Sequence, residues 1–333
     1  MKVMLAKIQE YFQIPPFAGA DLIHHVEEKD DVRIIYKVTT ADGQCFAVRI
    51  LSNSYTTRED LVGQARLCEM FSHAGLGVPK RLYKEDTLPY MTLSWKGQEA
   101  FAVVEEWMSG RELEHLNINL IGQVGEWLGK MHHISAKTNI PFSSESPWSM
   151  FGSNDELAQD AHTLKVALQK SEANRTLYEE LYALYEKKRA KLKKCWSHLP
   201  RGAVQGDFSL NNLLVNDDGN LCSVIDFHLA GADVFVGHFA GEGAFLSYAA
   251  ERMDDDSEKM GDIYFNAFMV GYKKNRQFSH QEQSILADLI GLRRAFACYQ
   301  VDDVLHKIEI RDIQEVNAEL EKMLFYMKKQ PNI

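Results

Sequence analysis

Short runs of mainly apolar residues recur in the first third of the chain, a pattern that predicts β-strands. β-branched and aromatic residues dominate these runs, and a turn sequence at Ala41–Gln44 separates two of them. We expect strands at residues 32–38, 45–51, 92–95 and 101–105. Between residues 58 and 73 the apolar positions take helical spacing, which predicts a helix that ends before Gly75.

After Ser109-Gly110 the pattern becomes mostly helical, with one interruption. The interruption is a predicted hairpin, in which apolar runs on either side flank the turn sequence Asn216–Asn220. We expect helices at residues 120–132, 155–196, 258–273, 280–305 and 313–328. This order predicts an α+β protein with two lobes, a small antiparallel-sheet N-terminal lobe at residues 1–107 and a larger, mainly helical C-terminal lobe at residues 108–333.

Three polar residues flank the hairpin at its open end. Asp207 and Asn212 lie in the loop before the first strand, and Asp226 follows the second. Because the two ends of a hairpin lie side by side, we expect these side chains to converge. Carboxylate and amide oxygens suit Mg²⁺ on nucleotide phosphates, and a nearby Asp can deprotonate an alcohol. Each residue alone also fits a turn or a cap, so the prediction of phosphoryl transfer depends on the combination.

Composition narrows the class of protein. The 333 residues are 45% hydrophobic and 25% charged, which is typical of a globular protein with an ample core. A net charge of −10 argues against binding to nucleic acid or to an anionic membrane. Five scattered cysteines contain no CxxC pair, so they predict neither a zinc site nor a disulfide framework. We expect a cytoplasmic protein, and the oligomeric state stays open.

The motifs resemble those of the aminoglycoside phosphotransferase and choline kinase family, relatives of the protein kinases. The family's His-Gly-Asp-x-x-x-x-Asn loop matches Gln205 to Asn212, and its Ile-Asp-Phe motif matches Ile225 to Phe227. Its Leu-Gly-x-x-Leu-x-x-Leu-His helix resembles Val124 to His132. The strand-borne Lys or Arg of the family falls on Arg49. The resemblance spans about residues 32–248 and implies a protein-kinase-like fold.

The same resemblance implies roles for single residues. Asp207 would be the catalytic base, and Asn212 and Asp226 would hold Mg²⁺. Arg49 would contact the α- and β-phosphates of ATP or GTP, although an arginine on a strand also fits a solvated, outward position. The backbone of the linker at Glu106 and Met108 would meet the adenine. The implied reaction moves the γ-phosphate to a hydroxyl of an aminoglycoside-, choline- or homoserine-like small molecule.

Three departures from the family pattern keep a second function open. Gln205 stands where the family has His, Gln64 stands where a helix Glu would pair with the strand base, and residues 27–31 contain no glycine. These features fit a nucleotide-binding pseudokinase with a scaffold or regulatory role. Retention of Asp207 and both metal-binding positions favours the enzyme. A protein kinase is disfavoured because the Asp-Phe-Gly and Ala-Pro-Glu motifs are absent from the sequence.

Carboxylates between residues 233 and 262 bear on the acceptor. They far outnumber the two basic residues among them, Arg252 and Lys259. Such a surface suits a cationic acceptor, but it also fits a solvated acidic loop before a helix. The carboxylates are Asp233, Glu242, Glu251, Asp254, Asp255, Asp256, Glu258 and Asp262. Nearby aromatic residues fit either a pocket lining or the core.

Overall fold

The computed structural model describes residues 2–28, 31–54, 56–85, 87–138, 140, 142, 144–253 and 257–329. The carboxylates expected at Asp254, Asp255 and Asp256 lie outside the described residues, as do Lys29 and Asp30 of the glycine-free stretch. The chain divides into two compact units. Unit 1 comprises residues 1–114, 140–144 and 210–231, and unit 2 comprises residues 115–139, 145–209 and 232–333.

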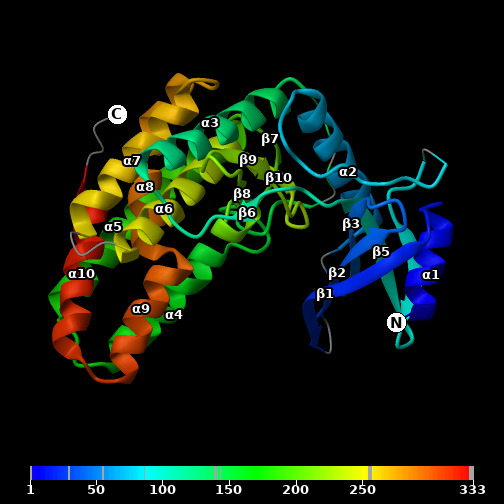
Figure 1. Ribbon diagram of the computed structural model, residues 1–333. Coiled ribbons are helices and arrows are strands. Elements are labelled where there is room, and N and C mark those ends of the chain that lie inside the picture. Colours follow the sequence, from blue (N-terminus) through cyan, green and yellow to red (C-terminus); the bar gives the residue numbers. More distant parts are fainter. Residues whose placement is uncertain are drawn as a thin grey trace. The chain divides into compact units, whose positions relative to one another are not determined.

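Unit 1 contains a five-stranded antiparallel sheet in the order β1-β2-β3-β5-β4, drawn in blue to cyan in Figure 1. The strands are β1 (Phe17–Glu28), β2 (Asp31–Thr40), β3 (Cys45–Asn53), β4 (Met91–Trp95) and β5 (Gln98–Glu106). The predicted strands correspond to β2 to β5. The edge strand β1 was not predicted; most of its residues are exposed, and its pairing with β2 shifts register between Leu22 and His24.

The two faces of this sheet carry different side chains because neighbouring residues on a strand point to opposite faces. Val48 and Val104 pack with Ile8 of α1 (Lys2–Tyr11) in one apolar cluster. Val103 packs with Leu61 of α2 (Arg58–His73) in another. The helix α2 has the predicted bounds and begins at an N-cap threonine.

The predicted hairpin is present in unit 1. Its strands are β8 (Leu213–Val215) and β9 (Leu221–Val224), and β6 (Arg111–Glu112) pairs with β8. The Val224 N–H donates to the carbonyl of Gly77 at 2.9 Å. A Cβ atom at Gly77 would lie 2.0 Å from the Cys222 carbonyl oxygen, so only glycine permits this approach.

Unit 2 is mainly helical (Figure 1). Its helices are α3 (Ile118–Ser135), α4 (Glu156–Lys170), α5 (Arg175–Cys195), α6 (Phe235–Met253), α7 (Ser257–Lys273), α8 (His280–Phe296), α9 (Cys298–Glu309) and α10 (Ile313–Lys328). A short strand β7 (Arg201–Val204) pairs with β10 (Gly231–Val234). No helix among the described residues is long and apolar enough to cross a membrane. The small sheet and the larger helical part confirm the α+β class.

Three helical expectations differ from the structure. The helix expected at 155–196 is two helices, because the Ser171 hydroxyl bonds the last turn of α4 and Asn174 caps α5. The helix expected at 280–305 ends at Ala297, whose ψ of 150° is extended. The helix α6 was not predicted at all. The lobe boundary expected at residue 107 stays a prediction.

Candidate active site

Arg49 is buried in unit 1 between two carboxylates. Its Nε lies 2.6 Å from Glu105 Oε1, and its Nη1 lies 3.1 Å from Asp226 Oδ2. The side chain alternates with Val48 and Ile50 and so points to the α2 face of the sheet. The alternative of a solvated, outward arginine is therefore wrong. Burial alone would lower the pKa of this guanidinium, but Asp226 and Glu105 outweigh burial and raise the pKa above its ordinary value.

The hairpin brings Asn212 and Asp226 together, as the sequence predicted for these two residues. The Ile225 N–H donates to the Asn212 carbonyl at 2.9 Å, so the two polar residues flank one hydrogen bond. Asp226 has a φ of 59°, a left-handed conformation that aspartate adopts more readily than most residues. Burial raises the pKa of Asp226, but Arg49 and His228 outweigh it and hold the pKa far below its usual range.

These two residues fit a magnesium ion by their donor chemistry. Asp226 offers an ionised carboxylate and Asn212 an amide oxygen, both of which are hard oxygen donors. That these two residues bind the metal stays a prediction.

The linker after β5 places the expected adenine-binding backbone. The Glu106 N–H donates to the Lys80 carbonyl at 2.9 Å, and the Trp107 N–H donates to the Cys45 carbonyl at 3.1 Å. Within the described part of the chain the Met108 N–H makes no hydrogen bond. Met108 is half-buried and Glu106 is exposed. The Met108 N–H is thus available to another molecule, and its contact with adenine stays a prediction.

The loop that carries Asp207 belongs to unit 2 and is held by its own side chains. Gln205 is 1% exposed, and its Oε1 accepts a hydrogen bond from the Asp207 N–H at 2.6 Å. Asp207 Oδ1 in turn accepts from the Ser209 N–H at 3.1 Å. Gly206 makes the turn possible with a φ of 94°. A glutamine can therefore hold this loop in the absence of the family's histidine.

Glu242 supports the same loop from α6, a role that the sequence did not indicate. Its Oε2 accepts from the Phe208 N–H at 3.2 Å, and its Oε1 lies 3.1 Å from His238 Nε2. His238 Nδ1 meets His132 Nε2 at 2.9 Å, and His132 Nδ1 meets the Tyr272 hydroxyl at 2.8 Å. Burial, and then His238, lower the pKa of His132 well below its ordinary value, so this histidine stays neutral. A buried polar chain thus anchors the residue next to Asp207.

A cavity of about 300 Å³ adjoins Asp207 within unit 2. Five carboxylates contribute to its lining, against a single arginine. The charged and aromatic lining residues are Glu156, Asp160, Asp207, Asp233, Glu242, Arg293, Trp148, Phe245 and Tyr299. Among the aromatic residues between positions 233 and 262, Phe235 and Phe239 belong to the core. The cavity is large enough for a small organic molecule.

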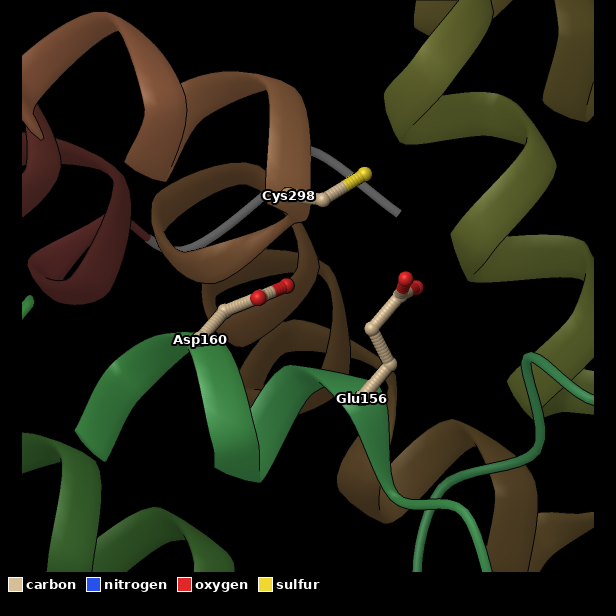
Figure 2. Close-up of side chains that lie close together, drawn as sticks. All are labelled: Glu156, Asp160 and Cys298. Atoms are coloured by element: carbon tan, nitrogen blue, oxygen red, sulfur yellow. The ribbon is translucent and has the colours of Figure 1, made fainter. Parts of the chain in front are cut away.

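One wall of this cavity is acidic and carries a thiol. Figure 2 shows Glu156 and Asp160 rising from α4 toward Cys298 at the start of α9. Their potential ligand atoms lie within 4.8 Å of one another. Burial, followed by the neighbouring Asp160, raises the pKa of Glu156 to about 7. Burial and Glu156 raise the pKa of Cys298 to about 11. The sequence offered no signal for this wall, because its residues come from α4 and α9, which lie far apart in the chain.

Comparison with known proteins places the fold. Among solved structures, an amicoumacin kinase in complex with AMP-PNP, Ca²⁺ and Ami matches at 14% identity and a TM-score of 0.64, covering 99% of this chain and 94% of that one. A microcompartment-associated aminopropanol kinase matches at 16% identity and a TM-score of 0.67, covering 97% of each chain. A choline kinase from Cryptosporidium parvum Iowa II matches at 12% identity and a TM-score of 0.53, covering 98% of this chain and 96% of that one.

No curated protein sequence matches the chain. The model of the phosphotransferase enzyme family (APH), in contrast, matches residues 33–240, which include Arg49, the loop from Gln205 to Asn212 and the Ile-Asp-Phe motif. The similar structures share its two-part architecture, in which a small antiparallel sheet accompanies a larger helical part. The chain therefore belongs to the phosphotransferase enzyme family, the aminoglycoside phosphotransferase and choline kinase group with the protein-kinase-like fold.

Proposed function

We propose that the protein transfers the γ-phosphate of ATP or GTP to a hydroxyl of a small molecule that carries a cationic group. One observation supports the acceptor class above all. Asp207, the aspartate of the family's catalytic loop, lines a cavity together with four other carboxylates. An ammonium group would gain a favourable field in such a cavity, whereas an anionic acceptor would be repelled.

Unit 1 holds the residues proposed to bind the nucleotide. Arg49 would contact the α- and β-phosphates, since a guanidinium makes paired hydrogen bonds to phosphate oxygens. The backbone at Glu106 and Met108 would meet the purine base. Asn212 and Asp226 would hold Mg²⁺, which, when bound, neutralises charge on the phosphates.

Unit 2 supplies the base and the acceptor side. Asp207 would accept a hydrogen bond from the substrate hydroxyl and take its proton late, because positioning matters most in a loose transition state. Gln205 and Glu242 fix the backbone on either side of Asp207 and so keep the carboxylate in place. The aromatic residues Trp148 and Phe245 would face the cationic group in the cavity.

Two of the similar structures support this acceptor class. Aminopropanol and choline, the substrates named for two of those kinases, each join a hydroxyl to a cationic nitrogen. No observation favours a pseudokinase. Gln205 and Gln64, which suggested that alternative, each make hydrogen bonds that hold the elements around the site.

The proposal is tested with matched pairs of acceptors. Aminopropanol is compared with propanediol, and choline with dimethylbutanol, each with Mg-ATP and with Mg-GTP. We expect the cationic member of a pair to be phosphorylated with a kcat/KM about tenfold or more above its neutral partner, measured by phosphorus NMR and by nucleoside diphosphate release. Equal rates within each pair would contradict a cation-selecting cavity.

A variant of Asp207, the proposed catalytic base, is tested beside this screen. Asp207→Asn keeps the shape of the side chain and removes its basicity, so we expect kcat to fall by about 10³-fold. Affinity for Mg-nucleotide, measured by calorimetry, should change less than about twofold, because Asp207 is proposed to serve the hydroxyl rather than the nucleotide. Normal turnover by Asp207→Asn would refute the assignment of the base.

A further inference from the structure

We propose that Glu105 on β5 is the positioning residue that orients Arg49 toward the nucleotide phosphates. In protein kinases a glutamate of the helix that follows the base-bearing strand pairs with the strand base. Here the corresponding helix is α2, and the carboxylate comes instead from a neighbouring strand of the sheet. The inference depends on the proposed function, because it concerns how the nucleotide is held.

The register of the sheet explains why these two side chains meet. Arg49 pairs with Val103, and Ala47 pairs with Glu105, so Arg49 and Glu105 are diagonal neighbours on one face of adjacent strands. Their Nε–Oε1 distance of 2.6 Å is that of a strong, charge-assisted hydrogen bond. Both residues are buried, with exposed fractions of 8% and 3%.

A second arginine completes the charge balance. Arg81 Nε lies 3.8 Å from Glu105 Oε2. Its Nη1 donates to the Leu61 carbonyl at 2.9 Å, which ties the guanidinium to α2. Two arginines thus share the buried space with two carboxylates, Glu105 and Asp226, and their formal charges cancel. Buried charges need such partners to offset the loss of hydration.

Gln64 fits this arrangement better than a glutamate would. Its Oε1 accepts from Arg81 Nη2 at 2.8 Å, and its Nε2 donates to the His228 carbonyl at 3.1 Å. An amide can accept and donate at the same time, whereas a carboxylate can only accept and would face the carbonyl oxygen. The helix α2 carries two glutamates, of which Glu59 is exposed. The other, Glu69, interacts with Tyr83.

Glu105 leaves one end of the guanidinium available for function. It holds Nε, so the terminal nitrogens point to the side of Asp226, where Nη1 already lies 3.1 Å from the carboxylate. That is the side on which we place the phosphates. Loss of the Glu105 charge would let the Arg49 guanidinium rotate. A planar guanidinium contributes little to phosphate binding unless its direction is fixed.

The first test removes the charge of Glu105. Glu105→Gln is expected to weaken Mg-nucleotide binding about tenfold in calorimetry and to raise the nucleotide KM similarly, the effect of losing one charge-assisted hydrogen bond. The matched control is Glu99→Gln on the same strand, whose carboxylate forms an exposed pair with Arg58. The control should stay within about twofold of the wild type. Wild-type nucleotide affinity in Glu105→Gln would overturn the inference.

The second test restores the helix carboxylate. If the helix position is the natural partner of Arg49, Gln64→Glu should raise nucleotide affinity or rescue Glu105→Gln. We expect the opposite, a loss of about fivefold without rescue, because the carboxylate would face the His228 carbonyl. Rescue would overturn the inference. Glu105→Asp, which keeps the charge with a shorter reach, should bind nucleotide with intermediate affinity, and this variant carries the test if Glu105→Gln does not fold.

Nucleotide affinity separates this inference from the proposed function. If the wild type binds Mg-nucleotide but phosphorylates no acceptor, the proposed function is wrong. The Glu105 variants would still show whether Glu105 orients Arg49. If the wild type does not bind Mg-nucleotide at all, both proposals are overturned.

Discussion

Charge is balanced in one unit of the protein and unbalanced in the other. Around Arg49 in unit 1, two arginines face two carboxylates. Five carboxylates line the cavity of unit 2, and the basic residues of that lining are Arg293 and His238. The pKa values of carboxyl groups shift in opposite directions in the two places. The pKa of Asp226 is held far below its usual range, while that of Glu156 is raised to about 7.

This difference indicates which of the two regions still needs a charged partner. The balanced set of unit 1 is complete within the protein, and its aspartate stays ionised. In the proposed function, this arginine would meet the phosphates and this aspartate the metal. The acidic wall of unit 2 has no comparable partner among the residues that line it, and a cationic ligand would supply one. Variants that break either side should therefore have separable consequences for the nucleotide and for the acceptor.

A large effect is expected on the balanced side. Asp226→Asn removes the carboxylate proposed to bind the metal and leaves Arg49 with one charged partner instead of two. We expect Mg-nucleotide affinity and kcat/KM to fall by about 10²-fold, measured by calorimetry at varied Mg²⁺ concentration and by steady-state kinetics. Acceptor binding should change little. An unchanged Mg²⁺ dependence in Asp226→Asn would contradict the metal assignment.

A moderate effect is expected on the unbalanced side. Glu156→Gln should raise the KM for a cationic acceptor about tenfold and leave the nucleotide KM unchanged. In the wild type this KM should fall as pH rises through about 7, because Glu156 becomes ionised in that range. The variant should lack this part of the pH profile. Identical profiles in the two proteins would show that Glu156 does not contact the acceptor.

The smallest effect concerns stability. Because the folded-state pKa of Glu156 is raised to about 7 from an ordinary value of 4.5, the folded protein holds this proton more tightly than the unfolded chain. The contribution is full below the ordinary value and is lost as pH rises through about 7. The Tm of Glu156→Gln should therefore decline less than that of the wild type over this window, by about 2 °C in calorimetry. A parallel decline would contradict the raised pKa.

Local sequence signals predicted most of the elements in unit 1. Short apolar runs and the Asn216–Asn220 turn were sufficient for β2 to β5 and for the hairpin that joins Asn212 to Asp226. Arg49 was expected as a site residue because the resemblance to the family implied that role. Glu105 was not, since a glutamate at the end of an apolar strand gives no sign of its partner. That pairing depends on the register of two strands more than fifty residues apart.

The elements that were not predicted from the sequence lack a clear periodic spacing of apolar residues. The exposed residues of β1 do not alternate, because neither face of that strand is deeply buried. The helix α6 contains glycines, and Gly237 and Gly243 approach large aromatic rings so closely that a Cβ there would lie within 3.0 Å of them. Tertiary packing stabilises this helix against its weak propensity. The acidic cavity is likewise formed by packing, because α4, α6 and α9 are far apart in sequence.

The register shift in β1 has a consequence for how the protein behaves in concentrated solution. A long, flat edge strand is a template on which another chain can add a strand and begin an aggregate. Leu22 and Ile23, each about half exposed at 51% and 52%, are the apolar residues that would favour such growth. The irregularity falls between Leu22 and His24 and interrupts the straight row of backbone groups at that point. We therefore expect this irregularity to disfavour the addition of a strand from another chain and so to limit aggregation.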